Sequence, residues 1–296
     1  MGAFYNLRRL MIVKVGLPLI LAFIMFSLGL GLRKKDFARV LEYPKAFFTG
    51  VVNQLVLLPI FAFLLVKVFS FSPELAVGVM ILSFCPGGVT SNVLAKVSNG
   101  NTPLSISLTA ITSLVSIITV PLFVALSVHH FMGVDAPEVD IVGLGLTMFL
   151  ITAVPVTLGM LVTAIAPAAV AKVSKGISRA AMILFFIIIV AALASNWAVF
   201  SSNLPSLGPA LILLNIAMLS LGLATSRLMK LKPADATTVS IESGVQNGTL
   251  GIAVGSLIAI GVTDTLPPTT VPSAVYSIIM YFITVPFVIW RRRTQK

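Results

Sequence analysis

One carboxylate stands inside an apolar stretch of this chain, and polar residues follow it at close spacing. Glu242 begins the segment Glu242-Ser243-Gly244-Val245-Gln246-Asn247-Gly248, which interrupts an otherwise apolar run. An ionised carboxylate at such a position is costly unless a partner compensates its charge. No Lys or Arg occurs at a comparable depth in the other apolar runs. Two explanations stay open: the carboxyl is protonated, or it binds a hard cation together with amide, hydroxyl and carbonyl oxygens.

A second interruption supplies more oxygen atoms of this kind. Cys85-Pro86-Gly87-Gly88 breaks an apolar run and is followed by Thr90-Ser91-Asn92. Proline removes an amide donor and glycine relaxes the backbone, so a helix is expected to break there. Ser105 and Thr109 are four residues apart and share one helix face, and Asn53-Gln54 is a polar pair in another run. The alternatives are hydroxyls bonded to their own helix and a Gln54 amide that bridges two helices.

The elements that must position these groups are membrane helices. The 296 residues are 58% hydrophobic and 10% charged, whereas soluble domains carry about 25% charged residues. Apolar runs of roughly 20 residues, each long enough to cross a bilayer core of about 30 Å, recur along the chain. In lipid such runs form helices, because every amide must be paired internally. The sequence predicts an all-α polytopic membrane protein, a single transmembrane domain over 1–296. Nine transmembrane helices are predicted near 13–32, 45–69, 74–97, 102–128, 139–166, 177–200, 208–230, 235–260 and 267–290.

Short connections and basic residues predict how these helices are threaded. Turn-forming residues occur at Ser70 to Pro73, Ser98 to Asn101 and Pro205 to Pro209. The first run lacks a small-residue cleavage site, so we expect a retained span and not a signal peptide. The net charge of +11 comes from residues at the ends of apolar runs. It therefore indicates topology, and no nucleic-acid partner is expected.

The basic residues favour one orientation. If the C-terminus is cytoplasmic, most basic residues fall on the cytoplasmic side, namely Arg33, Lys34, Lys35, Arg39, Lys45, Lys96, Lys172, Lys175, Arg179, Arg227, Lys230, Lys232, Arg291, Arg292, Arg293 and Lys296. Only Arg8, Arg9, Lys14 and Lys67 lie outside. The positive-inside rule thus predicts an outside N-terminus and a cytoplasmic C-terminus. Arg8-Arg9 is discordant, and fits a short amphipathic segment on the membrane surface. Short loops and the basic C-terminus favour a bacterial inner (plasma) membrane.

The two interruptions lie at equivalent places of the chain. They fall in the third and the eighth predicted helices, which are five apart and therefore run in opposite directions. An inverted repeat, in which helices 1–4 correspond to helices 6–9, predicts this arrangement. Broken helices at equivalent places of two inverted halves indicate the binding site of a transporter. Their free amides attract anions and their free carbonyls attract cations. The alternative is a pair of ordinary packing kinks.

At these residues the chain resembles the bile acid:sodium symporter family. The resemblance rests on Cys85 to Asn92, on Gly100-Asn101 with Ser105 to Thr109, and on Glu242 to Asn247 as a second crossover motif. Arg33 to Pro44 is similar to the first cytoplasmic loop of that family. The chain lacks the first helix of ten-span bacterial members and matches the nine-span form. It differs from many members at Val89 and at Met280-Tyr281, near the expected substrate path.

The resemblance implies a core domain built round two crossing broken helices, near 45–128 and 208–290. It implies a panel domain near 13–32 and 139–200. It also implies two sodium sites. The first would use Ser91, Asn92, Ser105, Thr109 and Glu242, and the second Gln54, Glu242, Gln246 and the backbone carbonyls of Ser243 and Val245. Asn247 would face the substrate near the crossover, with Gly88 and Thr90 beside it.

The resulting hypothesis is sodium-coupled symport of a small organic anion, a carboxylate or a bile-acid-like molecule, by alternating access. Sodium would neutralise Glu242 and hold the broken helices, so that the anion meets helix amides instead of a bare carboxylate. The alternative is a proton-coupled or sodium-independent transporter that uses a protonated Glu242. We do not expect an enzyme, since no Gly-x-Ser-x-Gly elbow and no paired intramembrane aspartates occur. The partners expected are the anion, sodium and the lipid bilayer, and the oligomeric state is left open.

Overall fold

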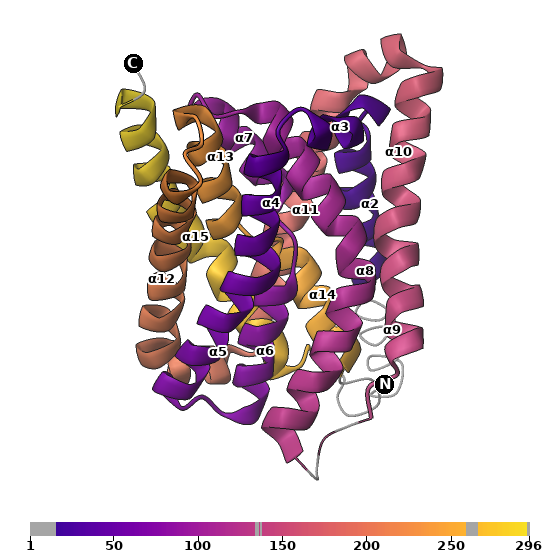
Figure 1. Ribbon diagram of the computed structural model, residues 1–296. Coiled ribbons are helices and arrows are strands. Elements are labelled where there is room, and N and C mark those ends of the chain that lie inside the picture. Colours follow the sequence, from indigo (N-terminus) through magenta and orange to yellow (C-terminus); the bar gives the residue numbers. More distant parts are fainter. Residues whose placement is uncertain (1–15, 134–135, 137, 259–265, 295–296) are drawn as a thin grey trace.

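The computed structural model describes residues 16–133, 136, 138–258 and 266–294. Within these residues the secondary structure is helical, and the helices run roughly side by side as a bundle (Figure 1). Their only β-type pairing is one isolated bridge, between Gly87 and Gln246. Four residues of the predicted charge distribution fall outside the described residues. They are Arg8, Arg9 and Lys14, predicted on the outer side, and Lys296, predicted on the cytoplasmic side.

Six helices in the described residues are long and apolar enough to cross a membrane. They are Pro44–Phe69 (α4 Pro44–Val52, η3 Asn53–Leu57, α5 Leu58–Phe69), α8 (Thr102–Met132), Ile141–Ile165 (α9 Ile141–Met148, η5 Phe149–Ala153, α10 Val154–Ile165), α11 (Pro167–Ser195), α12 (Trp197–Leu228) and Pro268–Thr294 (η6 Pro268–Thr270, α15 Val271–Thr294). The shorter helices are α2 (Leu17–Gly29), α3 (Lys34–Ala38), η2 (Arg39–Leu41), α6 (Pro73–Phe84), α7 (Val89–Val97), α13 (Pro233–Gly244) and α14 (Gly248–Ile258). The all-helical membrane architecture is thereby confirmed, whereas the number of nine crossings stays a prediction.

One predicted connection is wrong. Pro205 and Pro209, expected to form a turn, lie inside the continuous helix α12. The chain turns instead at Asn196, which has non-helical backbone angles and separates α11 from α12. The buried Asn196 amide donates a hydrogen bond of 2.7 Å to the Leu266 carbonyl. A proline costs a membrane helix only local hydrogen bonds that neighbours can replace, so a tertiary contact and not a proline sets this turn.

The helices gather into two groups of close neighbours. Helix α2 packs against η5, α10 and α11, whereas α12 packs against α13 and α15, and α6 against α8. Glycines let α2 and α10 approach closely. A Cβ on Gly29 would collide with the Val156 carbonyl, and a Cβ on Gly159 would collide with the Phe26 carbonyl. Small residues at such crossings let helix backbones approach in a membrane, where packing drives association.

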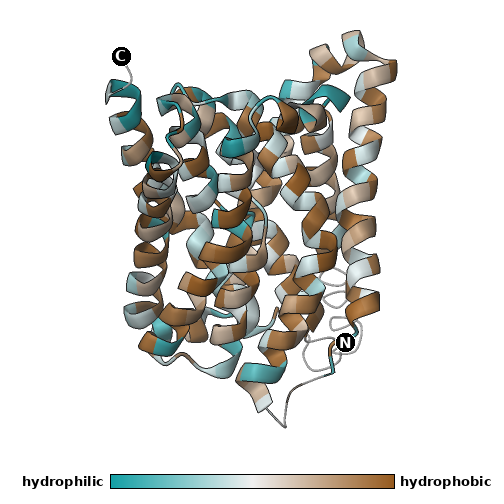
Figure 2. Ribbon diagram, in the orientation of Figure 1, coloured by the Kyte–Doolittle hydropathy of each residue, from teal (hydrophilic) through white to brown (hydrophobic). Residues whose placement is uncertain are grey.

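The polar residues lie mainly at the ends of the bundle (Figure 2). Helix α3, the start of α13 and the described end of α15 all lie at the end drawn uppermost in Figure 1. The basic residues of α3 and of the end of α15 therefore share one end, and the hydrophobic residues occupy the middle of the bundle. The orientation of this end in the membrane stays a prediction.

Candidate functional site

Two interrupted helices meet in the middle of the bundle. Helix α6 ends at Phe84 and α7 begins at Val89, and helix α13 ends at Gly244 and α14 begins at Gly248. Gly87 and Gln246 form an antiparallel bridge between the two interruptions. The Asn247 amide donates to the Pro86 carbonyl at 2.9 Å. The predicted breaks are therefore present, and the two broken helices contact each other at their breaks.

Local hydrogen bonds stabilise the starts of α7 and α14 at this crossover. The Ser91 hydroxyl donates to the Gly88 carbonyl at 2.6 Å at the start of α7. The Asn247 side-chain oxygen accepts from the Leu250 amide at 3.1 Å and from the Thr249 hydroxyl at 2.8 Å. Asn247 thus caps α14, as Asn commonly does at a helix N-terminus. The N-termini of α7 and α14 both begin at the crossover, where their first amides lack partners within the helix.

The carboxylate of Glu242 lies beside the crossover and is 1% exposed. Ser105 donates a short hydrogen bond to its Oε1, and Thr109 donates one of 2.9 Å to its Oε2. The Ser105 hydroxyl also lies 2.8 Å from Asn92 Oδ1, and Ser91 Oγ lies 3.5 Å from Thr109 Oγ1. The five residues predicted for the first sodium site therefore lie together. Within the described residues the hydrogen-bond partners of this carboxylate are hydroxyl groups, and none of them carries a positive charge.

Gly87 brings the crossover close to this carboxylate. A Cβ at Gly87 would lie 2.6 Å from Glu242 Oε2 and 3.5 Å from both Gln54 Nε2 and Thr109 Oγ1. The missing side chain lets the Gly87 backbone approach the carboxylate closely, beside polar groups of three different helical segments. Such a setting suits a small hard cation, which takes carboxylate, hydroxyl and carbonyl oxygens as ligands.

Gln54 adds an unpaired oxygen to the same region. It lies in the π-helical segment η3, is 1% exposed, and its Nε2 donates to Gln246 Oε1 at 3.4 Å. Its Oε1 has no hydrogen-bond partner. A buried acceptor without a partner costs about 1–3 kcal/mol, and a bound cation would satisfy it. Single π turns often occur at functional sites.

The remaining residues of the predicted second sodium site lie at the end of α13. Gln246 Nε2 donates to the Ser243 carbonyl at 2.9 Å. The Ser243 hydroxyl points elsewhere, since it donates to the Val239 carbonyl at 2.7 Å and accepts from Asn53 Nδ2 at 3.3 Å. The Ser243 hydroxyl is therefore already paired, and the use of its carbonyl for sodium stays a prediction. Val245 is buried and has extended backbone angles, so its carbonyl lies outside the helical hydrogen-bond pattern.

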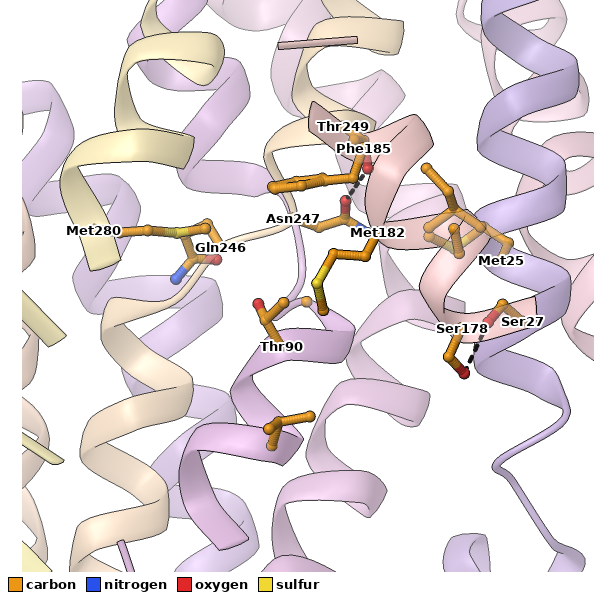
Figure 3. A pocket seen from close by; sticks show the side chains of 14 residues that line it. Met25, Ser27, Thr90, Ser178, Met182, Phe185, Gln246, Asn247, Thr249 and Met280 are labelled. Atoms are coloured by element: carbon orange, nitrogen blue, oxygen red, sulfur yellow. Dashed lines mark hydrogen bonds between the residues drawn. The ribbon is translucent and has the colours of Figure 1, made fainter. Parts of the chain in front are cut away.

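A cavity of about 180 Å³ opens beside the crossover. Figure 3 shows side chains from both groups of helices around it. Met25, Met182 and Phe185 lie toward the crossover residues, whereas the Ser27 hydroxyl donates to the Ser178 hydroxyl at 3.5 Å. The residues predicted to bind substrate, Gly88, Thr90 and Asn247, all line the cavity. Gln246, Thr249 and Met280 line it as well. The cavity has an apolar body and a polar wall, which is typical of a small-molecule site.

A second, larger cavity of about 650 Å³ shares Ser27, Val93 and Ser178 with the first. It is also lined by Arg33 and Lys96, two exposed cations at the end of the bundle that holds α3. The shared lining residues place the two cavities next to each other. The larger cavity thus has two cationic lining residues and adjoins the cavity at the crossover.

Several buried polar residues near the site were not predicted. These are Asn215 of α12 and Tyr276 of α15, which are fully buried and bond the end of α13. Tyr281, which was predicted to lie near the substrate path, donates to Thr90 at 3.0 Å. The signal for Asn215 is present in the sequence, because it is an isolated amide within an apolar run. The apolar residues of α2 and α11 that line the cavity carry no such signal.

Comparison with known proteins agrees with this geometry. The family model described as the sodium bile acid symporter family matches residues 18–203, more than half of the chain. The chain belongs to the sodium bile acid symporter family. The match begins in α2 and extends into α12, so it includes the first interruption, and relatives of the family align over most of the chain.

Relatives of this symporter family include bacterial, plant and animal proteins. The chain is 29% identical over 268 residues to the uncharacterized sodium-dependent transporter YocS of Bacillus subtilis (strain 168), covering 88% of this chain and 78% of the relative. It is 31% identical over 251 residues to the ileal sodium/bile acid cotransporter of Homo sapiens, covering 82% of this chain and 69% of the relative. It is 29% identical over 272 residues to the probable sodium/metabolite cotransporter BASS1, chloroplastic, of Arabidopsis thaliana, covering 92% of this chain and 66% of the relative.

Proposed function

We propose that this protein is a secondary active transporter that couples entry of sodium to uptake of a small organic anion. The observation that carries the proposal is the buried carboxylate of Glu242, which has hydroxyl partners and no cationic one among the described residues. A buried ionised group requires compensation. A bound sodium ion supplies it at a place where oxygen atoms converge, and the names of its relatives refer to sodium-dependent transport.

Two sodium ions are proposed, held by different sides of the same carboxylate. The first would be bound by Glu242 and by the oxygens of Ser91, Asn92, Ser105 and Thr109. The second would be bound by Glu242, Gln54 Oε1, Gln246 and the carbonyls of Ser243 and Val245. The partnerless oxygen of Gln54 supports the second site in particular.

The anion is proposed to bind in the cavity of about 180 Å³. The N-termini of α7 and α14 begin beside it, and helix N-termini favour negative charge. Asn247 keeps its side-chain oxygen turned to its own helix, so its amide nitrogen is the part that can meet an anion. The small volume and the lining by Met25, Met182 and Phe185 favour a compact carboxylate with an apolar body over a steroid-sized molecule.

The two groups of helices are proposed to be a panel domain and a core domain that move relative to each other. The proposed panel comprises α2, α9 to α10 and α11, and the proposed core comprises the other helices, because the cavity lies between α2 or α11 and the crossover. With nine crossings and a cytoplasmic C-terminus, the cavity with Arg33 and Lys96 opens toward the cytoplasm. The structure would then be the inward-open state of a transporter in a bacterial inner membrane, with the N-terminus outside.

Uptake into proteoliposomes tests the coupling. Radiolabelled carboxylates of graded size are offered to vesicles holding the purified protein, with an inward gradient of sodium, of potassium or of protons. We expect accumulation only with the sodium gradient, and faster accumulation for the smaller carboxylates. Accumulation that follows the proton gradient and ignores sodium would replace this proposal by the one in which Glu242 is protonated.

Thr109→Val probes one ligand of the proposed first sodium site. Valine keeps the shape of threonine but removes the hydroxyl that donates to Glu242 Oε2 at 2.9 Å. We expect the sodium concentration for half-maximal uptake to rise by roughly 10- to 150-fold, since one lost polar contact to a charged group is worth about 1.5–3 kcal/mol. Thr119→Val is the matched control, because the Thr119 hydroxyl bonds only the Val115 carbonyl of its own helix. An equal effect of both substitutions would contradict the assignment.

A further inference from the structure

The last carbonyl of helix α13 is held by two side chains from other helices. Asn215 Nδ2 donates to the Gly244 carbonyl at 2.6 Å, and the Tyr276 hydroxyl donates to the same carbonyl at 2.7 Å. Asn215 Nδ2 also donates to Tyr276 Oη at 3.0 Å, which closes a triangle of hydrogen bonds. Both side chains are fully buried. We call Asn215 and Tyr276 the Gly244 clamp.

The clamp separates the carbonyls at this helix end by direction. The Gly244 carbonyl is directed toward α12 and α15, where it accepts two hydrogen bonds. Val245 is extended, with φ −107° and ψ 113°, so its carbonyl lies outside the helical hydrogen-bond pattern, and the clamp does not bond it. The Ser243 carbonyl meets Gln246 Nε2 instead. The two carbonyls proposed as sodium ligands are thus kept apart from the one that the clamp occupies.

A third residue fixes the orientation of the clamp amide. Thr284 lies about two turns after Tyr276 in α15. Its hydroxyl donates to Asn215 Oδ1 at 3.4 Å. With its oxygen engaged there, the Asn215 amide presents its nitrogen to Gly244. Close packing confines the same place, since a Cβ on Gly244 would lie 2.8 Å from the Leu219 side chain. The carbonyl therefore has little freedom to rotate toward the sodium ligands.

We propose that Asn215 and Tyr276 are positioning residues for the second sodium ion. They hold the Gly244–Val245 peptide plane, and through it they direct the Ser243 and Val245 carbonyls toward the cation. This inference rests on the proposed sodium coupling. Neither residue touches the cation, and their loss lowers sodium affinity through the geometry of the carbonyls. Outer partners that orient metal ligands typically change affinity by about 10- to 100-fold when removed.

Helix α15 also connects the clamp to the anion cavity. Met280 lies one turn after Tyr276 and lines the cavity, and Tyr281 bonds Thr90 in the first turn of α7. Neighbouring side chains of one helix thereby contact the last carbonyl of α13 and the proposed anion site. This allows the two roles to be tested separately on a single helix.

The test measures sodium binding without transport. The purified full-length protein is heated in sodium chloride series against choline chloride, without any anion, because a ligand that binds the folded state raises the melting temperature by mass action. Tyr276→Phe, which removes one hydroxyl, and Asn215→Leu, which removes both amide donors, are compared with the wild type. Tyr281→Phe is the matched control on the same helix.

We expect the apparent sodium affinity to fall about 10-fold in Tyr276→Phe and more in Asn215→Leu, with wild-type affinity in Tyr281→Phe. In uptake assays at saturating sodium, Tyr276→Phe should keep the KM for the anion, whereas Tyr281→Phe should raise it. Wild-type sodium affinity in a folded Tyr276→Phe protein overturns the inference, and Tyr276→Phe alone decides if Asn215→Leu does not fold. If the wild type itself shows no sodium-dependent stabilisation or uptake, the proposed function fails along with the clamp.

Discussion

Glu242→Gln is expected to abolish sodium-driven uptake while the protein still folds. Glutamine keeps the length of the side chain, and its one carbonyl oxygen can still accept a hydrogen bond from Ser105 or from Thr109. It lacks the negative charge that both proposed sodium ions share. Removing one member of a buried, hydrogen-bonded charge pair costs about 2–5 kcal/mol, so sodium affinity should fall by at least roughly 30-fold. The measurements are sodium-dependent stabilisation and proteoliposome uptake across a sodium gradient.

Glu74→Gln is the matched control for this substitution. Glu74 lies in the first turn of α6, is exposed, and carries the same charge outside the site. Its replacement should leave the sodium dependence unchanged. Should Glu242→Gln retain wild-type sodium affinity, the carboxylate is not a sodium ligand. Should the variant transport at a rate independent of both sodium and pH, the ion dependence of the wild type comes from this carboxylate.

Gly87→Ala is expected to have the second largest effect, because it fills the space beside the carboxylate. The added methyl group would lie 2.6 Å from Glu242 Oε2 and 3.5 Å from Gln54 and Thr109. The neighbours must shift, and overpacking of this kind costs about 1–3 kcal/mol. We expect the loss to appear as a fall in sodium affinity of roughly 5- to 150-fold, measured by the melting temperature in sodium against choline.

The adjacent glycine provides a control that differs by one position. A methyl group on Gly88 would have its nearest neighbour, Thr90 Oγ1, at 3.6 Å, which is an ordinary contact. Gly88→Ala should therefore keep the sodium affinity, although Gly88 lines the anion cavity and the KM for the anion can change. Equal losses of sodium affinity in Gly87→Ala and Gly88→Ala would show that the crossover tolerates no methyl group, and would remove Gly87 from the sodium site.

Much of the site could be predicted from residue types along the chain. Pro86 and the adjoining glycines mark where one helix cannot continue, and the polar run after Glu242 marks the other. These are local properties, because proline removes a backbone N–H donor and glycine weakens a helix through its conformational freedom. The need for compensation at Glu242 also follows from the sequence, since no basic residue occurs at its depth. The prolines of α12 show the limit of predicting helix ends from residue types. Pro205 and Pro209 lie within a continuous helix.

By itself, the sequence determined that the chain is a helical membrane protein, where two helices break, and which carboxylate requires a partner. Only the tertiary structure decided that Gly87 meets Gln246 and that Asn215 and Tyr276 share the Gly244 carbonyl. It also decided that side chains of α2 and α11 form one wall of the cavity. The physical reason is that composition and local backbone chemistry act within a few residues. Which distant groups come into contact depends on how whole helices pack, and apolar side chains such as Met25 and Met182 carry no chemical mark of the surface that they will face.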